Sequence, residues 1–171
     1  MDSLWNNFFR SKLDEESLPA FLARVQVFAE LEKGDLNYLE QLVHVRNYAA
    51  NETVFEQDDP GTGMYIIRSG RVMIFTRDGS GTEEELTTLG SGDFFGETTI
   101  ASPAPRTFSA RTTENTELLG LFRPELLTTA SKRPEIANRI LFGLIRVISE
   151  RLQTATVEIR RLQLQHNNQK Q

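Results

Sequence analysis

Between residues 44 and 122, hydrophobic and polar side chains alternate with a period of two, and turn residues recur every eight to twelve positions. This period is typical of half-buried strands, because successive side chains of a strand point to opposite faces. Two breaks stand out: Asp78-Gly79-Ser80-Gly81 predicts a hairpin loop, and Asp58-Asp59-Pro60-Gly61 a second turn. The pattern predicts strands at residues 43–45, 53–55, 64–69, 71–76, 84–89, 107–112 and 117–122.

Short antiparallel strands with glycine-rich turns favour an α+β, mainly β fold, a double-stranded β-helix or jelly-roll barrel. Helical patterns precede the strands. A first pattern, at residues 3–12, predicts a segment that packs on the domain or on a second copy; a membrane or partner anchor is the alternative. Two further patterns are expected to cover one end of the barrel. The apolar residues of the first helical pattern are Leu4, Trp5, Phe8 and Phe9. Those of the second are Phe21, Leu22, Val25 and Phe28, and those of the third are Leu36, Leu39, Leu42 and Val43.

A long helix is predicted from Pro134 to about Gln165, with Gly143 as its only interior glycine or proline. At 1.5 Å per residue this helix would be roughly 45 Å long, which exceeds what one small domain needs to cover itself. It carries two apolar stripes. One is a heptad seam, formed by Leu141, Ile145, Ile148, Leu152, Ala155, Ile159 and Leu162; the other would face the barrel, through Ile136, Ile140, Leu144 and Val147.

The seam predicts a parallel homodimer through a coiled coil, with intramolecular packing of the seam as the alternative. We therefore expect four parts along the chain. These are an N-terminal helical segment at 1–27, a β-barrel with flanking helices at 28–133, the dimerisation helix at 134–165, and a polar tail at 166–171.

Composition narrows the function classes. The chain has 171 residues, a net charge of −5 and no cysteine. The negative charge argues against a broad nucleic-acid surface, so we expect no nucleic-acid partner, although a local basic patch is compatible with it. The absence of cysteine rules out disulfide and thiolate chemistry, and no apolar run is long enough to span a bilayer. We expect a cytoplasmic protein without a membrane span.

One stretch, Phe95 to Thr107, combines a glycine, a carboxylate and a guanidinium among small or apolar side chains. Gly96 would let a ligand approach the backbone closely. If residues 98–101 begin a short helix, their N–H groups would favour an anion, and Arg106 would add a forked cation for a phosphate. Glu97 can accept a hydrogen bond from a sugar hydroxyl. These features indicate a ligand with a phosphate and a ribose hydroxyl close together.

This stretch resembles the phosphate-binding segment of cyclic nucleotide-binding domains. The matching residues are Phe95-Gly96-Glu97 and Pro105-Arg106-Thr107, with nine positions from the glutamate to the arginine. The resemblance covers residues 28 to 152. It is to the sensor domains found in the catabolite activator protein and in regulatory subunits of cyclic-AMP-dependent kinase. We expect no DNA-binding domain of the catabolite activator type in this chain. A second block also matches, namely Asn51-Glu52-Thr53-Val54-Phe55, Asp58, Gly61, Met64-Tyr65-Ile66-Ile67 and Ser69-Gly70.

The resemblance implies cyclic AMP or cyclic GMP as ligand and no cofactor. It implies that Glu97 binds the ribose 2′-hydroxyl and Arg106 the cyclic phosphate, with backbone N–H groups of Gly96, Thr98, Thr99 and Thr107 serving the oxygens. The base would lie on Ile74, Leu86 and Phe95, and Arg151 and Thr154 would form a lid. Plainer roles stay open: an ion pair between Glu97 and Arg106, core positions for the apolar residues, and a solvated flank for the lid residues.

We interpret the chain as a cyclic nucleotide receptor, not an enzyme, that transmits binding through movement of its C-terminal helix to an unidentified partner. A dimerisation or scaffold module that keeps the fold but binds no nucleotide is the alternative. A third class, a cupin-type metal enzyme, would need two or three histidines with a carboxylate, and the chain has only His44 and His166. We therefore expect no metal site and no catalytic residue. The threonine at position 107 does not decide whether the base of the ligand is adenine or guanine.

Overall fold

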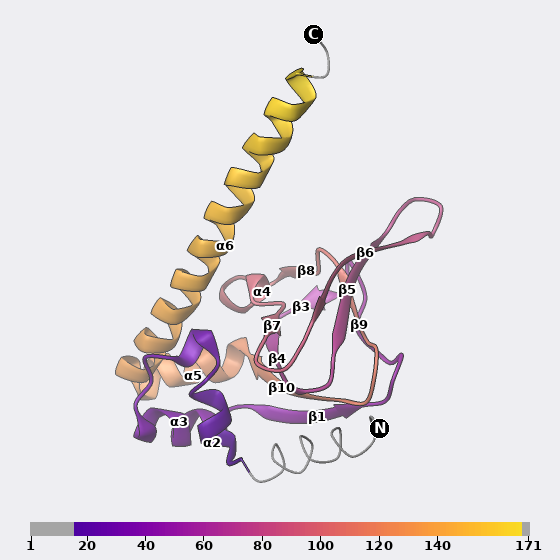
Figure 1. The fold of residues 1–171 in the computed structure, drawn as a ribbon. Helices are drawn as coiled ribbons and strands as arrows, with labels where there is room; N and C mark the ends of the chain where they lie inside the picture. The colour runs from indigo at the N-terminus through magenta and orange to yellow at the C-terminus, as the bar shows by residue number, and fades with distance from the viewer. Residues whose placement is uncertain (1–15, 169–171) are drawn as a thin grey trace, which may run out of the picture.

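The computed structural model describes residues 16–168, so the predicted helix at residues 3–12 lies outside the described residues. Two four-stranded antiparallel sheets form the centre of the molecule (Figure 1). The first has the order β1 (His44–Tyr48), β10 (Thr116–Phe122), β4 (Gly63–Ser69), β7 (Phe94–Phe95). The second has the order β2 (Thr53–Phe55), β9 (Ser109–Thr112), β5 (Val72–Arg77), β6 (Glu83–Leu89). A two-stranded ladder joins β3 (Pro60–Gly61) to β8 (Ala104–Pro105).

The two sheets face each other across a shared core, and the helices cover the outer side of the first sheet. Successive residues of β4 show both sides: Ile67 packs with residues of the second sheet, whereas Ile66 belongs to the core beneath the helices. This alternation is the period of two that the sequence predicts. The inner core consists of Phe55, Ile67, Val72, Ile74, Phe95, Ala110 and Leu118.

The predicted mainly β fold with flanking helices is confirmed. It takes the form of two facing sheets, and within residues 16–168 no hydrogen-bonded ladder joins the two four-stranded sheets into one. All seven predicted strands are present within one to two residues at most ends, and the hairpin loop after Arg77 closes through a hydrogen bond from the Asp78 N–H to the Thr82 carbonyl at 3.1 Å. The short strands β3, β7 and β8 were not predicted, since two residues carry no readable period.

Short helices precede the sheets: α2 (Leu18–Leu22), the 3-10 turn η1 (Gln26–Phe28) and α3 (Lys33–Glu40). Ser17 caps α2, and Glu32 and Asp35 form a capping box at the start of α3. The helical pattern of Phe21, Leu22, Val25 and Phe28 is divided between α2 and the 3-10 turn η1. The chain tightens at Arg24, whose N–H bonds the Phe21 carbonyl, and then enters η1, while the apolar side chains stay buried.

Two helices follow the last strand, α5 (Arg123–Lys132) and α6 (Pro134–Asn168). The inward stripe of α6 is confirmed, because Ile136, Ile140, Leu144 and Val147 are each no more than 3% exposed. Close contact is possible at Gly143, where an added Cβ would lie 1.9 Å from the Val27 carbonyl oxygen of η1. Helix α6 therefore docks on η1 through its own glycine.

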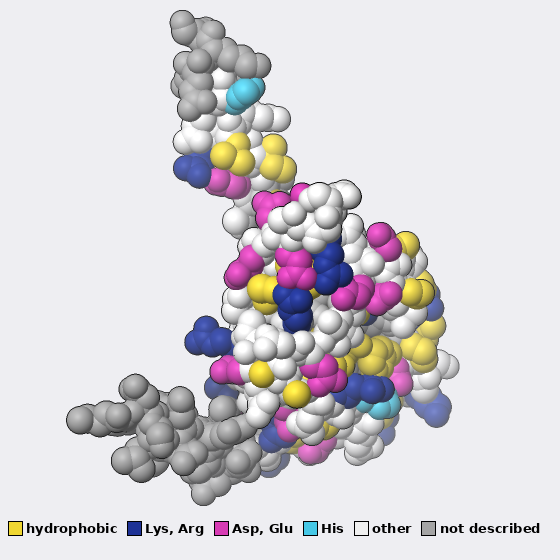
Figure 2. Space-filling view, turned by 90° about the vertical axis from the view of Figure 1, so that its right-hand side faces the viewer, with side chains coloured by type: hydrophobic (Ala, Val, Ile, Leu, Met, Phe, Trp, Pro, Cys, Tyr) yellow, Lys and Arg dark blue, Asp and Glu magenta, His cyan; other side chains and the backbone are white. Residues whose placement is uncertain are grey.

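The C-terminal part of helix α6 projects away from the sheets (Figures 1 and 2). Its seam residues are exposed there; Leu152 is 66% exposed and Ile159 is 56% exposed. The space-filling view shows hydrophobic side chains on the projecting helix (Figure 2). None of the helices within residues 16–168 combines the length and the apolar character needed to cross a bilayer.

Candidate functional site

A cavity of about 310 Å³ opens between the second sheet, β7 and helix α6. Most of its lining is apolar and aromatic, and two charged side chains, Glu97 and Arg151, face it. A mostly apolar cleft with a few convergent polar groups is typical of a small-molecule site. The lining consists of Ile74, Thr87, Leu89, Phe94, Phe95, Glu97, Phe108 and Arg151.

Glu97 is buried at the start of the short helix α4 (Thr98–Ala101) and is paired with an arginine from α6. Arg151 Nη1 donates to Glu97 Oε1 at 2.6 Å, and the guanidinium carbon lies 4.4 Å from the centre of the Phe94 ring. An ionised carboxylate has two oxygens and about four acceptor positions. Glu97 can therefore keep Arg151 and still accept a hydrogen bond from a hydroxyl in the cavity.

Arg106 lies on the other side of Gly96, in the segment between β8 and β9. Its side chain is 5% exposed and binds only neutral acceptors. Nη1 donates to the Gly63 carbonyl at 2.9 Å, to the Gly96 carbonyl at 3.1 Å and to Thr99 Oγ1 at 3.0 Å. The guanidinium also stacks 4.2 Å from the centre of the Phe55 ring. Rigid main-chain oxygens thus hold this cation in place.

Within residues 16–168 no carboxylate lies at ion-pair distance from Arg106, and its buried Nε has no hydrogen-bond partner. Burial lowers the pKa of the guanidinium, while the nearby Tyr65, Asp59 and Glu97 raise it. A buried charge without a counter-charge is unfavourable, because the low-dielectric surroundings replace water poorly. Arg106 therefore has both the charge and a free donor for an anion.

Gly96 lies between the Glu97 carboxylate and the Arg106 guanidinium, and its lack of a side chain allows the guanidinium to approach the backbone of residue 96. Its φ of +77° is the left-handed conformation that favours glycine, and an added Cβ would lie 2.5 Å from Arg106 Nη1. Glu97 pairs with Arg151 and not with Arg106, which removes the alternative role of a plain ion pair between Glu97 and Arg106. Arg106 does not line the cavity. Its guanidinium packs on the Phe55 ring, and the centre of that ring is 5.8 Å from the centre of the ring of Phe95, which does line the cavity.

Of the other predicted site residues, the structure places three at the cavity or at Arg106 and two on the surface. Ile74 and Phe95 line the cavity, and Thr99 contacts Arg106. Thr98 and Thr107 are exposed, and no side-chain hydrogen bond ties either of them to the other site residues within the described part of the chain. The main chain at residues 98–101 does form the short helix that the sequence suggested.

Leu86 does not line the cavity, which corrects one predicted base contact. Ile74 pairs with Thr87 and Phe75 pairs with Glu85, so Leu86 is the additional residue of a β-bulge. A bulge re-aims the side chain, and Leu86 lies 54% exposed in an adjoining groove between β6 and α6. Thr154, the second predicted lid residue, lines this groove, and its hydroxyl donates to the Glu150 carbonyl at 3.0 Å.

Four cavity residues were missed from the sequence: Thr87, Leu89, Phe94 and Phe108. The signal for Thr87 was available in principle, because it stands opposite Ile74 in the β5–β6 ladder. That signal needs the register of the hairpin, which the bulge shifts by one residue. Among residues 16–168 there is no group of three metal-ligating side chains placed to hold a metal ion.

Comparisons with known proteins agree with this geometry. The family model described as the cyclic nucleotide-binding domain matches residues 45–133. The chain is 36% identical over 131 residues to a CRP-like cAMP-activated global transcriptional regulator of Mycobacterium tuberculosis, covering 77% of this chain and 57% of that protein. It is 34% identical over 114 residues to the cyclic AMP receptor protein of Thermus thermophilus, covering 67% and 51%.

A solved structure, the catabolite activator protein of Thermus thermophilus, superposes with a TM-score of 0.72 at 30% identity, covering 80% of this chain and 62% of that one. More distantly, the regulatory subunit of a cAMP-dependent protein kinase from Colletotrichum orbiculare is 26% identical over 68% of this chain and 28% of its own length. The chain spans little more than half the length of the bacterial relatives that it matches. A domain of this kind fits cyclic AMP or cyclic GMP, and this chain belongs to the cyclic nucleotide-binding domain family.

Proposed function

We propose that the chain is a cyclic nucleotide receptor in which Arg106 binds the cyclic phosphate and Glu97 the ribose 2′-hydroxyl. The observation that carries this proposal is the buried Arg106 guanidinium, which among residues 16–168 donates to neutral acceptors and keeps a buried Nε–H without a hydrogen-bond partner. A phosphate would supply the missing counter-charge, and hydrogen bonds between charged partners are the stronger ones. Gly96, Thr98 and Thr107 would offer backbone N–H groups to the same ligand, whereas the predicted Thr99 N–H already donates to the Gly96 carbonyl at 3.4 Å.

The nucleotide base would lie on the apolar wall of the cavity, formed by Ile74, Leu89 and Phe108 with Phe94 and Phe95. Thr87 is the one hydroxyl of that lining, and the groove next to it leads to Leu86 and Thr154. The relatives named above are described as responding to cyclic AMP, so cyclic AMP is the first ligand to test and cyclic GMP the second.

Binding would be transmitted through α6. Arg151 belongs to this helix and also to the cavity wall, so a ligand that engages Glu97 changes the surroundings of a helical side chain. A ligand shifts an equilibrium between helix positions by as much as it favours one position over the other. In this proposal residues 28–133 are the sensing unit and residues 134–165 carry the signal to a downstream protein.

Calorimetric titration with cyclic AMP and cyclic GMP tests the receptor function. Arg106→Leu should weaken binding at least tenfold, since a charge-assisted hydrogen bond contributes about 1.5–3 kcal/mol. Arg68→Leu is the matched control, because Arg68 is a half-buried arginine of the same sheets, paired with Glu117 away from the cavity. Wild-type protein that gives no heat with either nucleotide at millimolar concentration would favour the alternative, a scaffold module without a ligand.

We also propose that the exposed seam of α6 forms a parallel coiled-coil homodimer. The seam residues Ile148 and Leu152 are 39% and 66% exposed, and apolar residues at heptad spacing are typical of such an interface. Lysine at both positions should give a monomer in light scattering. Val157→Lys is the control, because Val157 is 69% exposed on the same helix but lies off the seam. An unchanged mass for the double variant would refute the dimer through α6.

A further inference from the structure

The main chain of Arg106 is held by the loop between β2 and β3. The Arg106 N–H donates to the Asp59 carbonyl at 2.9 Å, and the Asp58 N–H donates to the Arg106 carbonyl at 2.9 Å. The β3–β8 ladder continues this pairing, with Pro60 opposite Pro105. The position of the Arg106 guanidinium therefore depends on the shape of this loop.

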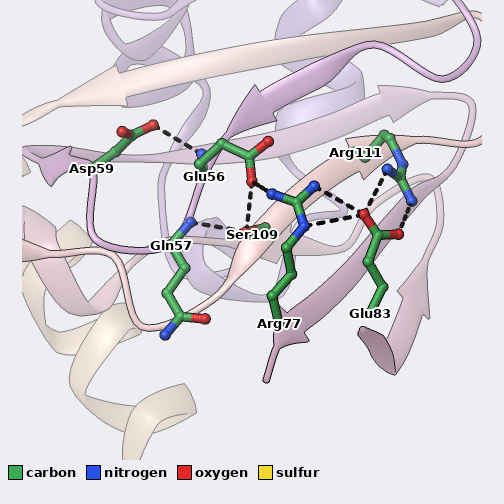
Figure 3. Close-up of polar contacts among 7 residues, drawn as sticks. All are labelled: Glu56, Gln57, Asp59, Arg77, Glu83, Ser109 and Arg111. Carbon is green, nitrogen blue, oxygen red and sulfur yellow. Dashed lines mark hydrogen bonds and ion pairs between the residues drawn. The ribbon is translucent and has the colours of Figure 1, made fainter. Parts of the chain in front are cut away.

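Glu56 fixes the shape of the loop from within (Figure 3). Its own N–H donates to Asp59 Oδ2 at 2.9 Å, and its carboxylate Oε2 accepts from Ser109 Oγ at 3.0 Å. The same Ser109 hydroxyl oxygen accepts from the Gln57 N–H at 2.9 Å, and Ser109 is 1% exposed. One buried hydroxyl thus links the Glu56 side chain to the loop backbone.

The Glu56 carboxylate is also the end of a chain of charges that crosses the second sheet (Figure 3). Arg77 Nη1 lies 2.9 Å from Glu56 Oε2, and Arg77 Nη2 lies 2.9 Å from Glu83 Oε1. Arg111 binds both oxygens of Glu83 from β9. The guanidinium carbons of Arg77 and Arg111 lie 5.3 and 4.7 Å from the centre of the buried Phe75 ring.

Each of these ion pairs is partly exposed, and isolated pairs of that kind contribute little to stability. Their shared carboxylates and stacked guanidinium groups instead restrict geometry, because each arginine is held by a fork of hydrogen bonds and by one aromatic ring. The network runs from the β5–β6 hairpin to the β2–β3 loop, whose backbone is hydrogen-bonded to the Arg106 main chain. Its organisation suits the positioning of a charged group better than it suits stabilisation.

We infer that Glu56 and Arg77 are positioning residues for the anion-binding Arg106, and that the β5–β6 hairpin supports the phosphate site through them. This inference rests on the proposed function, because it assigns the residues a role in phosphate binding. Neither side chain lines the cavity, so neither would contact a ligand there directly.

Titration of the full chain with cyclic AMP tests the inference. Glu56→Gln and Arg77→Met should each raise the Kd about threefold to tenfold. The matched control is Glu117→Gln, which breaks the Arg68–Glu117 pair of 2.9 Å and should leave the Kd unchanged. A double-mutant cycle separates positioning from general destabilisation, since coupled residues are non-additive. In an Arg106→Leu background, which lacks the cation that the loop is proposed to position, Glu56→Gln should have no further effect.

A Kd for Glu56→Gln equal to that of Glu117→Gln, with normal binding by wild type, would overturn the positioning role and leave the receptor function standing. The same loss in both backgrounds would also overturn it, because the effect would then be independent of Arg106. Failure of the wild type to bind either cyclic nucleotide would overturn the receptor function, and the positioning role with it.

Discussion

Two arginines flank Gly96 and Glu97, and they differ in what holds them. Arg106 is 5% exposed and is bound by main-chain oxygens of the β-sheet domain, and no carboxylate of the described residues pairs with it. The Arg151 side chain is 47% exposed, belongs to α6, and is paired with Glu97 at 2.6 Å. One cation is thus held by the sheets, and the other belongs to a helix whose outer half is exposed along its seam.

The difference suggests a division of labour between binding and reporting. A site that recognises a phosphate needs a donor that is held before the ligand arrives, since preorganisation reduces the cost of binding. A site that signals needs a contact that a ligand can alter, and the Arg151–Glu97 pair is such a contact. In the proposed function Arg106 is the fixed anchor and Arg151 is the element that responds.

The largest effect on ligand affinity is expected for a variant that displaces the Arg106 guanidinium. Gly96→Ala should weaken cyclic AMP binding at least a hundredfold, or about 3 kcal/mol, because it adds strain at a left-handed φ and displaces the Arg106 guanidinium. Calorimetry measures the loss. Gly81→Ala has the same kind of strain, at φ +84°, with no atom within 4 Å of the added methyl group. Equal affinities for the two variants would show that Arg106 does not depend on Gly96.

A second variant changes the packing of helix α6, to which Arg151 belongs. Gly143→Ala should lower the free energy of unfolding by about 1–3 kcal/mol, because its Cβ would lie 1.9 Å from the Val27 carbonyl oxygen and α6 would have to shift. Gly34→Ala in α3 meets no atom within 4 Å and should be neutral or stabilise by up to about 1 kcal/mol. Urea unfolding compares them; two stabilised variants would mean that α6 does not dock closely on η1.

The third variant separates binding from reporting. Arg151→Ala should weaken cyclic AMP binding by no more than about tenfold, because the pair is half exposed and screened by water. It should however abolish the change in hydrogen exchange that the ligand causes in α6. Arg146→Ala removes an arginine of the same helix that pairs with Glu30, and it should leave both readouts unchanged. A normal ligand response of Arg151→Ala would assign the reporting role to other contacts.

The smallest effect concerns the network behind Arg106 and appears in the pH dependence of stability. Hydrogen bonds from Arg111 and Arg77 lower the pKa of Glu83 from 4.5 to about 2. A lowered folded-state pKa stabilises the protein above the unfolded pKa, and this contribution is lost as the pH falls through the folded one. The stability difference between wild type and Glu83→Gln should therefore shrink as the pH falls below 4.5 and vanish below about pH 2. Glu84→Gln, a neighbouring exposed carboxylate, is the control; a difference that stays constant with pH would contradict the lowered pKa.

Much of the fold was predictable because it depends on local spacing. The period of two located the seven longer strands, and the inward stripe of α6 was read from steps of three and four residues. The stretch from Phe95 to Thr107 was recognisable for the same reason, since its glycine, carboxylate and arginine lie close together in the chain. The break between α2 and η1 was not predictable, because the same apolar residues stay buried on either side of it.

The sequence by itself determined which residue types are present at the candidate site and how far apart they stand along the chain. Only the tertiary structure decided that Glu97 pairs with Arg151, 54 positions away, and that Arg106 is left with neutral acceptors. It also decided that a bulge turns Leu86 into the groove and leaves Thr87 in the cavity. The physical reason is that side-chain direction in a sheet depends on register, and one inserted residue reverses the faces.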